Sequence, residues 1–270
     1  MNQAVLVTNP NSLPSRFERP GILSLFLTLL AVWFVAYSFQ GAGISLSELA
    51  SGFPEMISLL GQMLPPDTTR LPRIGWSLLE TFQMALVGTV IGIIVSFPLA
   101  ALASRATSPH PIVYQLARGI VSLFRTVPDL VWALFFVATV GLGPFAGTLT
   151  LAVDTIGFCG RFFAEGMEEV EKGPKEALTA LGATRTGIFF SFIVPASLPS
   201  FITSSLFSLE KAVRSSVVLG LVGAGGIGIE LKVAMDMFRY AEASMIILCI
   251  FALVILVERV SSRARKKLLD

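Results

Sequence analysis

The sequence predicts an all-α polytopic membrane protein with about six transmembrane helices, and two observations lead to that fold class. Of its 270 residues, 54% are apolar and only 14% are charged, whereas soluble domains carry about 25% charged residues. So little charge cannot cover a water-exposed surface of this size, which indicates that much of the surface faces lipid. The second observation is a set of uncharged runs near the length of about 20 residues that a bilayer-crossing helix needs.

Four uncharged runs predict transmembrane helices. They cover residues 22–39, 81–104, 187–209 and 243–257. Pro195 and Pro199 interrupt the third run, but it holds no ionisable side chain. The first run has neither a basic start nor a small-residue cleavage site after it, so we expect it to stay attached.

Two further helices are expected between residues 111 and 163, joined by a tight bend at the sequence GLGP, because glycine and proline together mark a turn. Arg125 and Asp129 are four positions apart, so on one helix they share a face and can pair away from lipid. Asp154 also needs a partner inside the bundle, which the sequence does not identify.

The distribution of basic residues predicts the orientation. With both termini on the cytoplasmic side of the inner membrane, the inner segments hold thirteen Lys and Arg and the outer segments six, in agreement with the usual excess of inner positive charge. This orientation places residues 164–187 in the cytoplasm. Residues 41–75 then form an outer loop, with an amphipathic helix that either rests on the membrane interface or packs on the protein.

The cytoplasmic segment contains a short amphipathic helix. Pro174 suits a first helical turn, and Ala177, Leu178 and Leu181 follow on one side. Gly182 ends or bends this helix before the chain returns to the membrane. Periodicity alone is also compatible with an ordinary connector between two spans.

The spacing in this segment resembles a loop of the permease subunits of ABC importers. Glu176 and Ala177 match the E-A-A part, Gly182 matches the glycine, and Pro195 matches the proline of I-x-L-P. Apolar residues replace the remaining motif positions; they are Leu178, Phe192 and Val194. The resemblance implies the type I ABC importer permease fold, and it implies that residues 174–186 are a coupling helix that docks in a groove of the ATPase.

Three stretches narrow the resemblance to the phosphonate-transport branch of these permeases: residues 124–147, 160–178 and 213–228. The resemblance implies two copies of an ATPase subunit that holds ATP and Mg²⁺, a second permease chain, an external solute-binding protein, and phosphonate or a related phosphorus oxyanion as cargo. No cofactor is expected in this chain. The predicted organisation is an N-terminal segment with the first helix and outer loop (1–74), a permease core (75–262) and a basic cytoplasmic tail (263–270).

A glycine-rich segment has the G-x-G-x-x-G spacing of a dinucleotide-binding turn at Gly223, Gly225 and Gly228. Such a turn needs a parallel sheet and an acidic residue about 20 positions later. That region is instead an apolar helix, so dinucleotide binding is excluded. With Gly226, these glycines form either a partly re-entrant element that rearranges during gating or a close helix contact made by small residues.

Cations near this segment are candidates for the path of an anionic cargo, because positive charge lowers the cost of moving an anion into a low-dielectric interior. The candidates are Lys211, Arg214 and Arg125. Each cation also has a simpler role. Lys211 and Arg214 can pair with Glu210 or with lipid headgroups, and Arg125 can pair with Asp129.

Other function classes fit less well. The chain has no P-loop motif and must obtain energy from a partner. The alternative is a secondary transporter driven by an ion gradient. Such proteins usually have a broken helix in each of two related halves, whereas this sequence shows a single glycine-interrupted segment. An intramembrane enzyme lacks H-E-x-x-H and G-x-S-x-G motifs, and the single histidine, His110, leaves no histidine cluster for a metal site. The net charge of +2 gives no indication of nucleic-acid binding.

Overall fold

The computed structural model describes residues 21–269 and divides the chain into two units between Ser58 and Leu59. The first unit holds α1 (Ile22–Gly41) and most of α2 (Leu46–Gln62). Every side chain of α1 is exposed although the helix is strongly apolar, as expected for a helix whose environment is lipid. The helix expected in the loop after the first span is present as α2.

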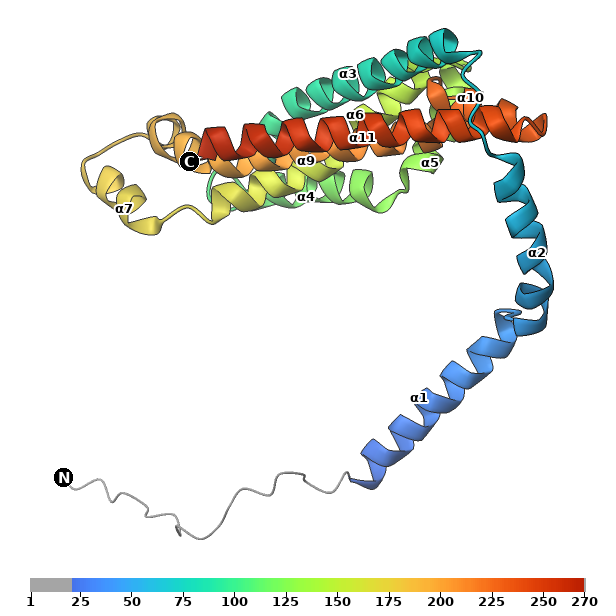
Figure 1. Ribbon diagram of the computed structural model, residues 1–270. Helices are drawn as coiled ribbons and strands as arrows, with labels where there is room; N and C mark the ends of the chain where they lie inside the picture. Colours follow the sequence, from blue (N-terminus) through green and yellow to red (C-terminus); the bar gives the residue numbers. More distant parts are fainter. Residues whose placement is uncertain (1–20, 270) are drawn as a thin grey trace. The chain divides into compact units, whose positions relative to one another are not determined.

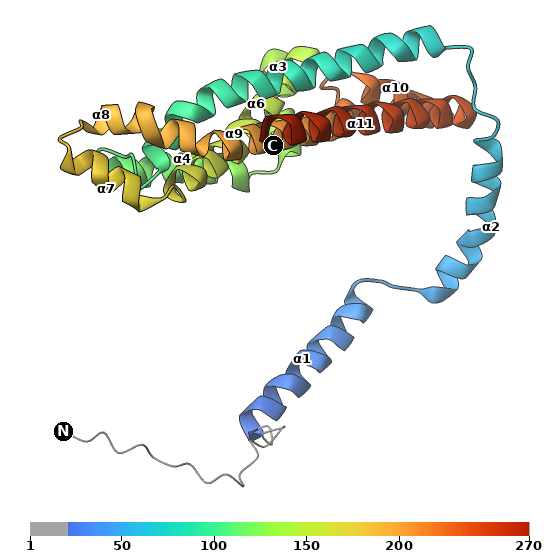
Figure 2. The same cartoon turned by 60° about the vertical axis from the view of Figure 1, so that its left-hand side comes forward.

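The second unit is a bundle of helices. Its elements are α3 (Leu71–Ala103), α4 (Pro111–Thr126), α5 (Asp129–Val140), α6 (Pro144–Glu168), α7 (Lys172–Ala180), α8 (Arg185–Ile188), the π-helical turn η1 (Phe189–Ile193), α9 (Val194–Leu221), α10 (Ile227–Asp236) and α11 (Tyr240–Leu269). The long helices α3, α6, α9 and α11 lie side by side (Figure 1, Figure 2). We call the end that carries α7 and α8 the α7 end, and the opposite end, which carries α10, the α10 end. The all-α fold is confirmed for residues 21–269.

Helix length and composition support four or five membrane spans. The four are α1, α3, the continuous stretch from α8 to α9, and α11. α4 and α5 qualify together as a fifth, with an angle of 89° between them. The sixth expected span corresponds to α6, which has 25 residues but is less apolar because it contains Asp154 and Arg161.

Residues 111–163 contain two breaks rather than the one expected at GLGP. The first lies at Val127 and Pro128, where the backbone is extended, and it separates Arg125 on α4 from Asp129 on α5. The expected pairing of Arg125 with Asp129 on one helical face is therefore wrong. The physical reason is Pro128, since proline disfavours the helical conformation of the residue before it.

The span predicted at residues 187–209 continues to Leu221, because neither Pro195 nor Pro199 ends the helix. Pro195 is the second residue of α9, where the missing N–H costs little, and η1 precedes it. Lys211 and Arg214 therefore lie within α9, not at the end of a span as the sequence analysis placed them.

The glycine segment forms a turn and a close helix contact. Gly223, Gly225 and Gly226 have φ values of 89°, 90° and 74° and form the turn between α9 and α10, a conformation that glycine adopts without strain. At Gly220, a Cβ atom would lie 2.6 Å from the Cα of Gly228. Small residues thus allow α9 and α10 to pack closely, and whether the segment rearranges during gating stays a prediction.

α6 is the central helix of the bundle, and glycines let α3 approach it. α6 contacts α3, α4, α5 and α9, and 14 of its 25 residues are buried. A Cβ atom on Gly88 of α3 would lie 2.8 Å from the Cβ of Leu151. A Cβ atom on Gly92 would lie 2.9 Å from the carbonyl oxygen of Ala152, so the two backbones touch along this line.

We predict that Gly92→Ala destabilises the bundle by about 1–3 kcal/mol, because the added methyl group must displace Thr155 or separate the two backbones. Gly119→Ala on α4 is the matched control, because nothing lies within 4 Å of its Cβ position. Thermal unfolding in detergent measures both variants. Equal melting temperatures for the two would contradict the close contact between α3 and α6.

Candidate functional site

The helix predicted at residues 174–186 is α7, which begins two residues before Pro174 and ends at Ala180. Gly182 follows with φ of 81°. The Gly182 N–H donates to Thr179 O at 3.0 Å and the Ala183 N–H to Leu178 O at 3.0 Å, which is the hydrogen-bond pattern of a Schellman ending. Gly182 therefore ends α7 because it supplies the left-handed conformation that this ending requires.

α7 has one face toward the bundle and one toward solvent. Leu178 packs against the buried cluster that includes Phe163 and Ile193. Glu176, Ala177 and Leu181 are exposed. The sequence analysis placed Leu178 on one side of the helix with Ala177 and Leu181. In the structure Leu178 packs against the bundle, whereas Ala177 and Leu181 are exposed. Pro195, which follows η1, belongs to the helix that returns through the bundle and not to the exposed face.

A carboxylate at the end of α6 fixes the turn between α3 and α4 beside α7. Glu168 Oε1 accepts from the backbone N–H of Arg105 at 2.7 Å and from Nη1 of Arg118 at 3.1 Å. Arg118 also donates to Ala103 O at 3.2 Å. Hydrogen bonds that involve charged groups are the stronger kind. The sequence analysis did not identify Glu168, because its partners lie 50 and 63 positions away.

Inside the bundle, Asp154 of α6 pairs with Lys211 of α9, and Nζ lies 2.6 Å from Oδ1. Lys211 Nζ also lies 5.6 Å from the centre of the Phe158 ring, within the range of a cation–π contact. This pair supplies the partner that Asp154 needs. It also means that the positive charge of Lys211 is already balanced within the chain.

Glu210 is buried and pairs with Arg265 of α11, whose Nη1 lies 2.8 Å from Oε1. The angle is not that of a hydrogen bond, so the attraction is between the charges themselves. Arg265 was assigned to a basic tail, but α11 continues without a break to Leu269. The pairing of Glu210 with Lys211 or Arg214 does not occur.

Arg214 and Arg125 are exposed, and in the described part of the chain neither forms an ion pair. Arg214 is three residues after Lys211 on α9, so the two share one side of that helix. Arg125 lies at the end of α4, beside Arg118 and Arg161. The structure therefore brings Lys211 and Arg214 together and leaves Arg125 apart from them.

At the α10 end, the glycine turn is held to α3. The Gly226 N–H donates to Glu80 Oε1 at 3.0 Å, and the Ile227 N–H donates to Thr81 Oγ1 at 2.7 Å. A carboxylate and a hydroxyl thus bind the free N–H groups at the start of α10. The Gly143 N–H donates to Gly223 O at 3.0 Å, which joins the turn before α6 to the same place. Sequence reasoning did not identify Glu80 or Thr81.

These features together define a polytopic membrane transport component with an exposed connector helix. The family model described as the binding-protein-dependent transport system inner membrane component matches residues 88–266, and the chain belongs to this family. Its matched region begins within α3 and includes α7, the glycine turn and the ion pairs of Lys211 and Glu210.

Two relatives and one solved structure are similar to the chain. The phosphite transport system permease protein PtxC of Stutzerimonas stutzeri is 36% identical over 240 residues, which is 89% of this chain and 85% of PtxC. The phosphate-import permease protein PhnE of Mycolicibacterium smegmatis is 38% identical over 224 residues, 83% of this chain and 42% of PhnE. The fold is similar to a chain of the inward-facing MetNI methionine ABC transporter, with a TM-score of 0.65, 23% identity, and coverage of 74% of this chain and 98% of that chain.

We predict that the Asp154–Lys211 pair is energetically coupled. Lys211→Met leaves a carboxylate that is 15% exposed without its partner, and the double variant with Asp154→Asn removes that unpaired charge. Because Lys211 is 36% exposed, water weakens the pair, and we expect a coupling energy of about 1 kcal/mol. Unfolding of both single variants and the double variant in detergent measures it; strict additivity would contradict the coupling.

Proposed function

We propose that this chain is the transmembrane subunit of an ATP-driven importer that carries a phosphorus oxyanion into the cell. A separate ATPase drives the transport, and α7 transmits the motion. The observation that carries the proposal is the exposed face of α7. Glu176, Ala177 and Leu181 are exposed on this helix, whereas Leu178 packs against the bundle. An exposed helical face that combines apolar side chains with a few charged ones has the character of a docking surface.

The proposal includes partners that the chain itself lacks. Two ATPase copies hold ATP and Mg²⁺, a second permease chain completes the pathway, and an external binding protein delivers the cargo. The family description supports a binding protein as a partner. The relatives PtxC, a phosphite transport permease, and PhnE, a phosphate-import permease, support a small phosphorus oxyanion as cargo. We place the α7 end and both termini on the cytoplasmic side, from the excess of inner Lys and Arg.

For the path, we propose that Lys211 and Arg214 on one side of α9 offset the negative charge of the cargo. Among residues 21–269 Arg214 has no carboxylate partner, so its charge is available, whereas Lys211 must leave Asp154 or share its charge with the cargo. The glycine turn of Gly223, Gly225 and Gly226, together with Gly228 at the start of α10, follows Arg214 along the chain and serves as the element that rearranges at the outer side.

Reconstitution in liposomes tests the main proposal. With the ATPase inside and the binding protein outside, phosphite uptake requires ATP. Uptake driven by an ion gradient in the absence of the ATPase would overturn the proposal and establish the secondary transporter instead.

Glu176→Lys is expected to reduce ATP-dependent uptake at least tenfold, because it reverses the charge of the single carboxylate of α7. Glu55→Lys is the control, because Glu55 is an exposed carboxylate on α2. Pull-down of the ATPase by each variant separates docking from folding. Full ATPase binding and full uptake with Glu176→Lys would remove α7 from the docking role.

Arg214→Ala is expected to lower oxyanion uptake several-fold while assembly with the ATPase stays intact, because an exposed side chain without partners contributes little to stability. Lys266→Ala, another exposed cation near the end of α11, is the control. Initial uptake rates over a range of cargo concentrations are the measurement. Unchanged rates with Arg214→Ala would exclude this side chain from the path.

A further inference from the structure

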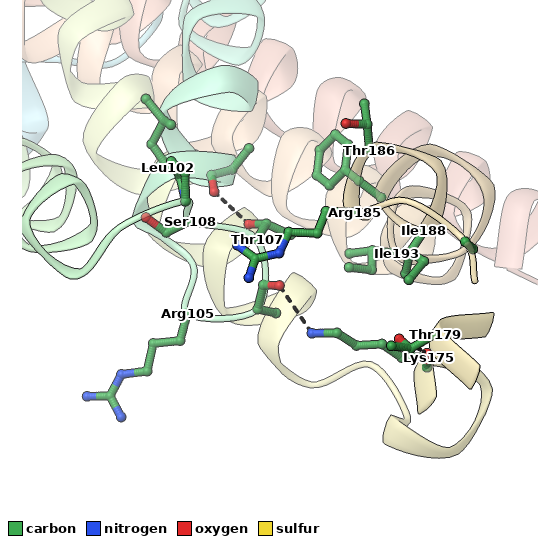
Figure 3. Close-up of a pocket in the computed structure, with 15 residues that line it drawn as sticks. Leu102, Arg105, Thr107, Ser108, Lys175, Thr179, Arg185, Thr186, Ile188 and Ile193 are labelled. Carbon is green, nitrogen blue, oxygen red and sulfur yellow. Dashed lines mark hydrogen bonds between the residues drawn. The ribbon is translucent and has the colours of Figure 1, made fainter. Parts of the chain in front are cut away.

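The α7 end contains an open cavity of about 720 Å³ that the proposed function does not use. The cavity is bounded by the end of α3, the turn that follows it, α7, α8 and η1 (Figure 3). Its volume is in the range of small-ligand sites. We call it the α7 cavity, and it lies on the bundle side of α7, away from the exposed face with Glu176.

The charge of the α7 cavity is positive. Among the residues that line it, three are cations (Arg105, Lys175 and Arg185) and none is an aspartate or glutamate. Some other cations at this end have carboxylate partners, as Arg118 has Glu168. Within the lining itself, no carboxylate balances the three cations.

Two of the three cations are directed into the cavity. Lys175 Nζ donates to Ala106 O at 3.2 Å, and this single bond leaves further N–H groups of the ammonium free. The side chain of Arg185 extends toward Thr107 (Figure 3), and within residues 21–269 it forms neither an ion pair nor a hydrogen bond. Arg105 instead points away and donates to Tyr114 Oη at 3.1 Å.

The remaining polar groups do not satisfy these cations. The Thr107 hydroxyl donates to Ala101 O at 2.6 Å and the Thr179 hydroxyl to Lys175 O at 2.8 Å, and within residues 21–269 neither hydroxyl accepts a hydrogen bond from Lys175 or Arg185. Apolar side chains, including Leu102, Ile188 and Ile193, form other walls. Next to such walls the local dielectric is lower than in water, and a charge pair there is stronger.

We propose that the α7 cavity binds a tetrahedral phosphorus oxyanion between Lys175 and Arg185. A guanidinium matches two oxygens of a phosphate group, and an ammonium contacts a third as a point charge. The same chemistry is presented by a free oxyanion in the cytoplasm and by the phosphate of an anionic lipid headgroup. Because Lys175 belongs to α7 and Arg185 to α8, the bound anion connects α7 with α8 and restrains the movement of α7.

Binding itself is independent of the proposed function, whereas the effect on coupling rests on it. Titration of the purified full-length chain with inorganic phosphate, followed by calorimetry in detergent, measures binding without ATPase or transport. We expect saturable binding that Arg185→Gln and Lys175→Gln each weaken at least tenfold. Arg263→Gln makes the same charge change at an exposed position of α11 outside the cavity, and it is expected to leave binding unchanged.

A second arm identifies the source of the oxyanion. The chain is placed in nanodiscs of phosphatidylcholine or phosphatidylglycerol, and bound lipid is counted by native mass spectrometry. Retention of phosphatidylglycerol that is lost in Arg185→Gln, with no phosphate binding, assigns the cavity to a lipid headgroup; phosphate binding in both nanodiscs assigns it to a free oxyanion.

Hydrogen exchange gives an independent readout of the restraint. Bound phosphate or phosphatidylglycerol is expected to slow amide exchange in residues 172–183 at least several-fold in the original chain, and not in Arg185→Gln. The proposal is overturned if neither ligand binds, or if Arg263→Gln weakens binding as much as Arg185→Gln does. Failure of ATP-driven transport would leave these results unaffected, so the two proposals fail separately.

Discussion

The bundle depends on the contact between α3 and α6, where two helical backbones touch without intervening side chains. In lipid there is little hydrophobic force between helices, so close van der Waals packing and hydrogen bonds must hold them. Gly88 and Gly92 remove side chains from the α3 face, and Ser96 continues that face with a hydroxyl that donates to Gly92 O at 2.6 Å. With α3 so close, α6 is surrounded by neighbours, and this explains why it tolerates charged residues that a lipid-facing helix would not.

Ion pairs then determine how the other helices meet. Asp154 joins α6 to α9, Glu210 joins α9 to α11, and Glu168 joins α6 to α4. Each pair places opposite charges from two helices together, which offsets part of the cost of removing them from water. Among residues 21–269, Glu176 on the exposed face of α7 and Arg185 in the α7 cavity form no such pair. These are the two places where we propose that another molecule binds.

Much of this arrangement was predictable from the sequence. Uncharged runs predicted α1, α3, α9 and α11, and the spacing around Gly182 predicted the short helix α7, because hydrophobic length and glycine endings are local properties. The partners of Asp154 and Glu210 were not predictable, since Lys211 and Arg265 lie 57 and 55 positions away and only packing brings them close. The expected pairing of Arg125 with Asp129 was wrong because it assumed one continuous helix through Pro128. Proline disfavours the helical conformation of the residue before it, and this effect outweighs an i, i+4 charge pattern.

The last turns of α11 contribute to the charge balance inside the bundle. A sequence rich in Arg and Lys after residue 262 reads as a dispensable extension, yet Arg265 neutralises a carboxylate that is 7% exposed on another helix. Shortening the protein before that residue leaves the charge of Glu210 without this partner in the interior. A truncation at the end of the apolar run therefore alters the electrostatics beside Lys211.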